Sequence, residues 1–251
     1  MRYKLLTCEV FARQVYYLAA FAPDIIDIEL VDKGLHNEPD TLRARLQERL
    51  DALPEDRYDA VLLAYGLCSN STAGLVCRQA PMVIPRVHDC ISIFLGSAER
   101  YSDEFRGHPG TFWYTPDYIE RGGGESGSLS LGAAGDEHSM AKAYEEYVVK
   151  YGKDNADYLM EVMGAWQQHY DRAAYVVPSE MEMPDYRAGT REQAAHRGWQ
   201  FVELEGSLIL LHDLIRGQWD PRRFLVIPPG RTLTPSNDAA IMVGCPAGTI
   251  R

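Results

Sequence analysis

The sequence predicts an α/β protein whose strands form a mainly parallel sheet, in two lobes built from repeated βα units. Short apolar runs alternate with stretches of helical spacing along the first hundred residues, and again after residue 172. The apolar runs do not alternate strictly with polar residues, which is typical of strands buried on both faces of a parallel sheet. Hydrophobic residues make up 46% and charged residues 24% of the 251 residues, so a packed core is expected.

The expected elements follow one another in βα order. Strands are expected at 3–8, 24–31, 58–66, 81–87, within 109–120, and at 173–178, 199–204 and 223–229. Helices are expected at 9–22, 38–53, 90–105, near 187–197 and through 208–217. The tail after residue 229 is rich in turn-forming residues, and we expect it to pack on the surface without regular structure.

We expect three segments along the chain. Residues 1–120 form an N-terminal α/β lobe that carries the candidate site, and residues 172–251 form a C-terminal α/β lobe with its tail. Residues 121–171 lie between them as a glycine-rich loop followed by a helical pair.

The charge and hydropathy of the chain exclude several classes of partner. The net charge is −11 and no basic patch is present, so binding to nucleic acid is not expected. No apolar window is long enough to span a bilayer, and the N-terminus lacks the pattern of a secretory signal. We therefore expect a soluble cytoplasmic protein without membrane or nucleic-acid partners, acting on a small molecule.

The cysteines are expected to be thiols. An odd number of cysteines without a signal peptide argues against a disulfide framework. Cys77 is expected to pack in the core, while Cys245 in the tail has no assigned role. The five cysteines are Cys8, Cys68, Cys77, Cys90 and Cys245.

Three cysteines and two histidines are expected at one edge of the sheet. Cys8, Cys68 and Cys90 each follow a predicted strand, and His36 and His88 lie in loops at the same strand ends. Ligands of open parallel sheets bind outside these carboxyl ends. Thiolate and imidazole together are typical ligands of zinc, and three thiolates equally suit an iron–sulfur cluster with one open iron. Taken singly, each of these residues is more typical of core packing or hydrogen bonding.

Neighbouring residues add candidate roles to this site. Arg86 and Asp89 flank His88, where they orient the imidazole or bind a substrate carboxylate, or else form a surface ion pair. His88, Asp89 and Arg86 are therefore the candidate catalytic set. The backbone amides of Ser69, Asn70 and Ser71 are candidates for holding an anionic cofactor or substrate group, although these residue types also cap helices.

Several blocks of the sequence are distinctive: TCEV, GLH, YGLCSNSTAGL, PRVHDCISIFLGS, PGTFWYTP and YGKDNADYLME. In these blocks the chain resembles, over about residues 3–230, the bacterial and archaeal family called domain of unknown function 1638. The resemblance implies no defined chemistry, but it implies a one-carbon context, because members are often encoded near corrinoid-dependent methyltransferase systems. Proteins of such a system, and a corrinoid, are thus expected as partners only through this resemblance.

Three functional hypotheses follow from the residues and the resemblance together. The first is a metal-dependent transferase or sulfur-processing enzyme that acts on a thiol, methyl or sulfur-containing small molecule. The second is a carrier or assembly protein that binds a metal or small molecule without turnover. The third is an enzyme without metal, in which His88 activates Cys90 as a nucleophile.

Overall fold

The structure is a computed structural model that describes residues 1–121, 148, 153 and 170–246. The chain divides into two compact units, Met1–Tyr101 with Gly206–Arg251, and Ser102–Glu205. The first unit is therefore assembled from both ends of the chain, which differs from the consecutive lobes 1–120 and 172–251 that the sequence predicts. Most of the predicted loop and helical pair at 121–171 lies outside the described residues.

The first unit contains a five-stranded sheet with the strand order β2-β1-β3-β4-β8. The first four strands of this order pair in parallel, as predicted, whereas β8 pairs antiparallel with β4. The strands β3 and β4 are buried along their whole length, as expected for a sheet covered on both faces. The strand bounds are β1 Arg2–Cys8, β2 Ile25–Val31, β3 Ala60–Ala64, β4 Met82–Pro85 and β8 Phe224–Ile227.

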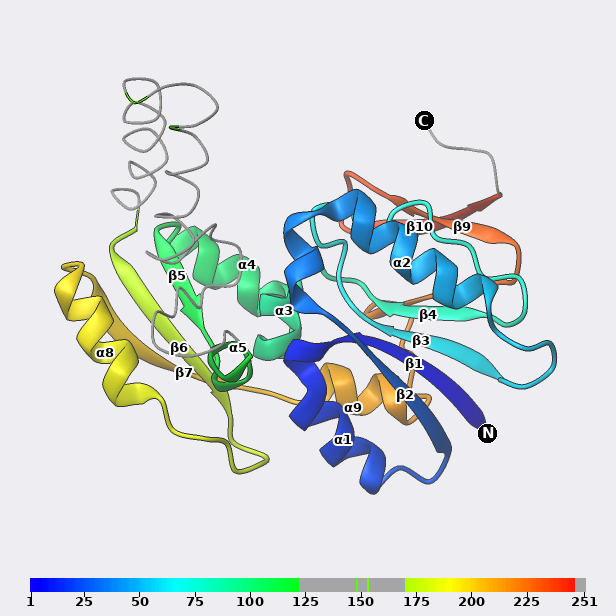
Figure 1. Cartoon of the computed structure of the whole chain (residues 1–251), viewed down its shortest axis with the longest axis horizontal. Coiled ribbons are helices and arrows are strands. Elements are labelled where there is room, and N and C mark those ends of the chain that lie inside the picture. Colours follow the sequence, from blue (N-terminus) through cyan, green and yellow to red (C-terminus); the bar gives the residue numbers. More distant parts are fainter. Residues whose placement is uncertain (122–147, 149–152, 154–169, 247–251) are drawn as a thin grey trace. The chain divides into compact units, whose positions relative to one another are not determined.

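Helices cover both faces of this sheet (Figure 1). The helices α1 and α9 lie on one face, and α2 lies on the other. The helix α2 packs on the sheet through Leu42, Leu46 and Leu50, which are all buried in the core cluster. The helical elements of this unit are η1 Glu9–Phe11, α1 Ala12–Ala20, η2 Lys33–Asn37, α2 Pro39–Asp51, α3 Cys90–Leu95, α9 Ile209–Ile215 and the start of α4 Ala98–Gly107.

The single helix predicted at 90–105 is instead the two helices α3 and α4. Gly96 ends α3 with a φ of 77°, a left-handed conformation that glycine adopts without strain. A Cβ at this position would lie 2.7 Å from the side chain of Ser207, so the close packing there also requires glycine. The glycine inside the apolar run is therefore a helix stop.

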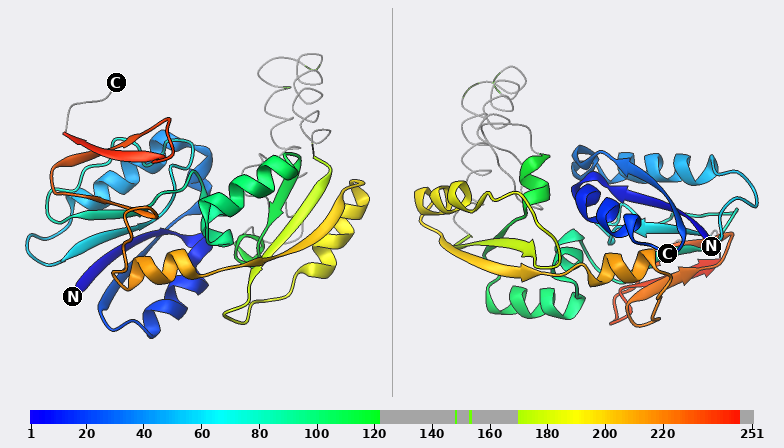
Figure 2. Two further views of the ribbon diagram at one scale, coloured as in Figure 1. Left: turned by 180° about the vertical axis from the view of Figure 1, so that it is seen from behind. Right: turned by 90° about the horizontal axis from the view of Figure 1, so that it is seen from below.

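The C-terminal tail forms a β-hairpin, which the sequence did not predict. Strand β9 (Arg231–Pro235) pairs antiparallel with β10 (Met242–Pro246). Figure 2 shows these two strands near the C-terminus. The side chain of Arg86 holds this tail, because its Nη1 donates to the carbonyl oxygens of Ala240, at 2.7 Å, and Met242, at 2.5 Å. Its Nε donates to the carbonyl oxygen of Pro221 at 2.9 Å.

This arrangement corrects the predicted role of Arg86. The guanidinium is bound to the backbone carbonyls of Pro221, Ala240 and Met242, and Arg86 does not line the cavity described below. Burial lowers the pKa of Arg86, and Asp238 acts in the opposite direction, so the group stays a cation that joins the tail to β4.

The second unit contains the three-stranded sheet β5-β6-β7, with β5 and β6 parallel. Its core is aromatic, with Phe112, Tyr114, Tyr175 and Trp199 all buried. Its described elements are β5 Thr111–Tyr114, α5 Pro116–Glu120, β6 Arg172–Pro178, α8 Arg187–His196, β7 Gln200–Gly206 and the end of α4. Across the described parts of both units, no helix combines the length and apolar character needed to cross a membrane.

The chain segments that leave β3 and β4 remain in contact beyond the ends of the strands. The amide of Leu67 donates to the carbonyl of Val87 at 3.1 Å, and the amide of Cys68 donates to the carbonyl of His88 at 2.8 Å. Gly66 permits this approach, since a Cβ there would lie 2.8 Å from the amide nitrogen of Asp89. Two backbone hydrogen bonds thus hold together the segments that lead to Cys68 and Cys90.

Replacing Gly66 by alanine should force these two segments apart. We expect Gly66→Ala to destabilise the protein by about 1–3 kcal/mol, the usual cost of overpacking, measured from urea denaturation midpoints. Gly244→Ala is the matched control in the same unit, because its Cβ would meet Ile227 at an ordinary 3.5 Å. Equal stability of the two variants would show that the segments do not need the close approach.

Removing the guanidinium of Arg86 should loosen the C-terminal hairpin. We expect Arg86→Ala to cost about 2 kcal/mol, because buried carbonyls lose charged donors, and to expose residues 231–246 to limited proteolysis. Arg222→Ala is the control, since that exposed side chain pairs only locally with Asp220. Unchanged protease resistance in Arg86→Ala would contradict the anchoring role.

Candidate functional site

A small cavity of about 20 Å³ lies at the carboxyl ends of the parallel strands in the first unit. Of its wall residues, Asp32 is exposed, so solvent reaches the cavity on that side. The walls combine thiols, one imidazole, one phenol, two charged side chains and two apolar side chains. They are Cys8, Cys68, Cys90, His36, Tyr65, Asp32, Lys33, Phe11 and Leu42.

The three predicted cysteines meet at this cavity. Cys8 is the last residue of β1, Cys68 follows β3, and Cys90 is the first residue of α3, directly after β4. Burial raises the pKa of Cys8 to about 11 and that of Cys68 to about 12. Burial also raises the pKa of Cys90 well above its usual value, with further contributions from Cys68, Asp89 and Cys8. The three thiols are thus close enough for the charge of one to oppose ionisation of another.

Backbone amides point at the sulfur atoms. Hydrogen bonding from the backbone of Val10 to Cys8, and from Gly66 and Cys90 to Cys68, acts against the rise of the thiol pKa values. Amide donors of this kind stabilise thiolates and are common around sulfur ligands of metals. These backbone hydrogen bonds therefore stabilise the thiolate form, which burial alone would destabilise.

Cys68 begins an unusual left-handed turn. Cys68, Ser69 and Asn70 have φ values of 46°, 55° and 64°, a region that residues other than glycine rarely occupy. The turn is closed by hydrogen bonds, since the amide and the hydroxyl of Ser71 both donate to the carbonyl of Cys68. Each such residue costs of order 1–3 kcal/mol, and this kind of strain gathers at functional sites.

His36 and Tyr65 add two polar groups to the cavity wall. Burial lowers the pKa of His36, with Asp89 acting in the opposite direction, so its imidazole is neutral near pH 7 and can ligate or accept a proton. Tyr65 is 3% exposed, and its buried hydroxyl has no hydrogen-bond partner among the residues that the structure describes. Burial, followed by the charges of Cys8, Cys68, Glu9 and Cys90, raises the pKa of Tyr65, which keeps the phenol protonated.

His88 and Asp89 do not have the roles that the sequence predicts. The side chain of His88 is exposed and does not line the cavity, and the residue contributes only its carbonyl, which accepts from the amide of Cys68. Asp89 caps α3, because its carboxylate accepts from the amide of Ser92 at 3.2 Å. Burial raises the pKa of Asp89, while hydrogen bonds from Ser92 and Tyr101 oppose the rise.

Of the three amides predicted to hold an anion, that of Ser71 donates to the carbonyl of Cys68 and is therefore not free to bind one. The next two amides, of Thr72 and Ala73, likewise donate to the carbonyls of Leu67 and Asn70. Ser69 and Asn70 are exposed and do not line the cavity. The segment thus shapes the turn that positions Cys68.

No group of three or more His, Cys, Asp or Glu side chains within the described residues has the arrangement needed to hold a metal ion as it stands. The three thiols share a cavity without forming a closed ligand set. The other two cysteines lie elsewhere, with Cys77 buried in the core cluster, as expected, and Cys245 on β10.

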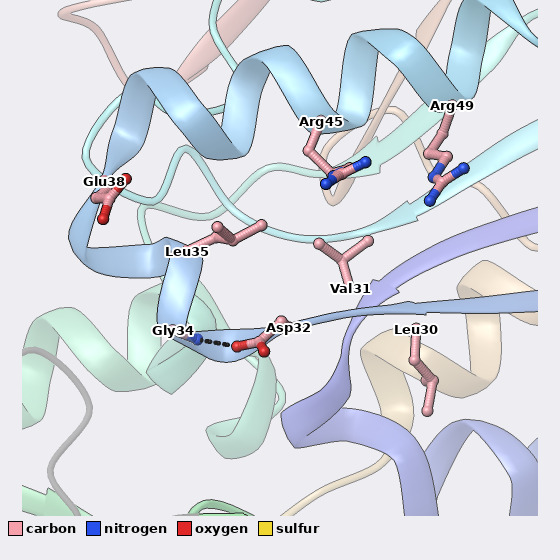
Figure 3. A pocket seen from close by; sticks show the side chains of 8 residues that line it. All are labelled: Leu30, Val31, Asp32, Gly34, Leu35, Glu38, Arg45 and Arg49. Atoms are coloured by element: carbon pink, nitrogen blue, oxygen red, sulfur yellow. Dashed lines mark hydrogen bonds between the residues drawn. The ribbon is translucent and has the colours of Figure 1, made fainter.

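A larger and more open pocket of about 480 Å³ lies beside the cavity and shares Asp32 with it. Figure 3 shows Arg45 and Arg49 extending from α2 toward the end of β2. Both cations already have partners, since Arg45 pairs with Glu48 at 2.8 Å and Arg49 with Glu29 at 2.9 Å. The charges of this pocket are therefore largely balanced within the protein.

Tyr65 is a site residue that the sequence did not indicate. It is a phenol placed directly after the wholly apolar β3. A polar aromatic residue at the carboxyl end of a buried parallel strand was the signal that could have identified it.

Comparison with known proteins agrees with the resemblance seen in the sequence. The family model described as protein of unknown function (DUF1638) matches residues 30–215. Neither the curated proteins nor the solved structures gave a match. The matched range includes Cys68, Cys90, His36 and Tyr65, whereas Cys8 precedes it. The chain belongs to the DUF1638 family.

Proposed function

We propose that this protein binds one zinc ion through Cys8, Cys68 and Cys90 and uses it to activate a small thiol for group transfer. The observation that carries the proposal is that all three cysteines line one cavity together with the neutral imidazole of His36. Three protein ligands and one open position are the pattern of catalytic zinc sites.

The surroundings of the thiols favour a cation in the cavity. The three thiols, of which Cys68 is buried and Cys8 and Cys90 are partly buried, oppose one another's ionisation, so a positive charge that compensates them favours the thiolates. The amides that point at the sulfur atoms of Cys8 and Cys68 assist the same ionised state. Because no group of three or more His, Cys, Asp or Glu side chains among the described residues is arranged to hold a metal ion, the proposed binding requires the three cysteine side chains to change conformation.

The size of the cavity favours a single ion over an iron–sulfur cluster. A volume of about 20 Å³ corresponds to one or two water-sized groups at most. A cluster of several irons and sulfides would have to displace the side chains of Phe11, Leu42 and Tyr65, which line the cavity and are all buried.

A nucleophilic cysteine without metal fits the site less well. A nucleophilic thiol needs a lowered pKa, whereas burial raises the pKa of Cys90. The base assigned to that mechanism, His88, has an exposed side chain outside the cavity wall.

The proposed reaction places a thiolate against an electrophilic carbon. A bound zinc ion would lower the pKa of the substrate thiol and hold its sulfur as a nucleophile. His36 accepts the proton of the thiol. The substrate sulfur then forms a bond to the transferred methyl group, and the methyl carrier leaves with the electron pair of the broken bond. A methylated corrinoid protein is the carrier that the family resemblance implies, and binding without turnover remains the second candidate.

Metal analysis tests the proposal directly. We expect the protein, purified without oxygen or chelators, to contain about one zinc per chain and no visible colour. Cys68→Ser should lose nearly all of this zinc, whereas Cys245→Ser should retain it, because Cys245 lies outside the cavity. Absence of metal from the unsubstituted protein, or equal zinc in both variants, would refute the zinc site, and visible absorbance from bound iron would favour the cluster instead.

Zinc binding should release protons. The thiols have pKa values above the usual 9.0, so all three are protonated at about pH 7.5 and must ionise on binding. We expect release of three protons per zinc, measured by titration calorimetry in buffers that differ in ionisation enthalpy. Cys8→Ser should release two and Cys245→Ser three. Release of one proton or none would mean that the cysteines are not the ligands.

The same raised pKa values determine how the metal-free protein responds to alkali. Because the thiols ionise at a lower pH in the unfolded chain than in the folded one, the unfolded chain releases protons first as pH rises above about 9. Stability should therefore fall between about pH 9 and 11, and bound zinc should suppress the fall. A metal-free protein whose denaturation midpoint is constant over this range would contradict the burial of the thiols.

A further inference from the structure

The chain segments that carry Cys68 and Cys90 lie against each other at the cavity. The amide of Cys68 donates to the carbonyl of His88 at 2.8 Å, and the sulfur of Cys68 accepts a hydrogen bond from the backbone of Cys90 itself. Both side chains line the same cavity of about 20 Å³. The two thiols therefore share one small space, and backbone contacts keep their residues together.

Cys90 interacts more strongly with Cys68 than with Cys8. Of the charges that raise the pKa of Cys90, that of Cys68 contributes most, and that of Cys8 contributes less than that of Asp89. A disulfide joins only two thiols. The pair therefore does not depend on the arrangement of three side chains that a metal ion requires, which the described residues do not present.

The other walls of the cavity suit a small uncharged oxidant. The volume of about 20 Å³ holds one or two water-sized groups, which is enough for hydrogen peroxide. Lys33 and Asp32 both line the cavity with opposite charges, which offset each other and give an ion no net advantage. The buried hydroxyl of Tyr65 has no hydrogen-bond partner in the described part of the chain, and a protonated phenol donates to an oxygen atom of a peroxide.

We propose that Cys68 and Cys90 are a thiol pair that hydrogen peroxide oxidises to a disulfide within the cavity. Cys90 reacts first, because it is partly exposed whereas Cys68 is buried. Its sulfur bonds to one oxygen of the peroxide, the O–O bond breaks, and the thiol proton leaves with the other oxygen as water. The sulfur of Cys68 then bonds to that of the sulfenic acid, whose hydroxyl leaves with the proton of Cys68 as a second water. The two thiols lose two electrons and the peroxide gains them.

This inference goes beyond the proposed zinc site and does not rest on it. Burial disfavours the thiolate form of both cysteines, whereas a disulfide is uncharged and carries no such cost. Because both thiols are protonated near pH 7, the oxidation is a slow modification and not a rapid turnover reaction. The disulfide also removes two of the three proposed zinc ligands, so the oxidised chain loses that site.

Mass spectrometry of the metal-free full-length protein tests the pair. The protein is treated with hydrogen peroxide at about pH 8 in the presence of a chelator, and its remaining thiols are alkylated after denaturation. We expect the alkylated cysteines to fall from five to three, because two form the disulfide, and a thiol reductant to restore all five. In a tryptic digest, residues 58–78, which contain Cys68, should be linked to residues 87–100, which contain Cys90.

Two variants identify the linked cysteine, because residues 58–78 also contain Cys77. Cys77→Ala should keep the link and Cys68→Ser should lose it. A link that persists in Cys68→Ser, or a link through Cys8 in the unsubstituted protein, would overturn the pair. Five alkylated cysteines after a peroxide treatment that oxidises the denatured chain would overturn it as well. Absence of zinc from the unoxidised protein would refute the zinc site alone, since the disulfide is measured without metal.

Discussion

The candidate site depends on the close approach of the chain segments that leave β3 and β4. The amides of Leu67 and Cys68 donate to the carbonyls of Val87 and His88 and hold the two segments together. Gly66 allows this approach because no side chain fits between the two segments. A side chain at this position would push apart the segments that carry Cys68 and Cys90. The sheet therefore brings the cysteines to one edge, and the glycine brings the loops together.

The turn that starts at Cys68 has backbone conformations that cost free energy. Three successive residues other than glycine adopt left-handed backbone conformations. Hydrogen bonds from Ser71 and Thr72 to the carbonyls of Cys68 and Gly66 offset part of that cost. A chain under selection for stability alone would accommodate glycine or asparagine at such positions more readily than cysteine. The strain is thus consistent with a thiol that is retained for its chemistry.

The sequence was sufficient to predict the α/β class and the convergence of Cys8, Cys68, Cys90 and His36. That success follows from a general property of parallel sheets, whose strands all end at the same edge. The directions of side chains at the strand exits could not be predicted, so the sequence indicated His88 and not Tyr65. Side chains of a strand point alternately to its two faces, and one irregular residue at the end of a strand changes which side chain points inward. The pairing of β8 was also unpredictable, because its partner β4 is far away in sequence.

The position of β8 in the first sheet affects how the chain folds during its synthesis. Residues 224–227 supply the strand that pairs with β4, yet they follow the whole of the second unit in the sequence. While the chain is being synthesised, β4 is an apolar edge strand with unpaired backbone groups until these residues emerge. The loop closure that completes the sheet then spans more than half of the polypeptide, which slows folding relative to local pairing. A nascent chain of this protein is therefore vulnerable to aggregation at one defined edge, and the second unit must be synthesised before that edge is covered.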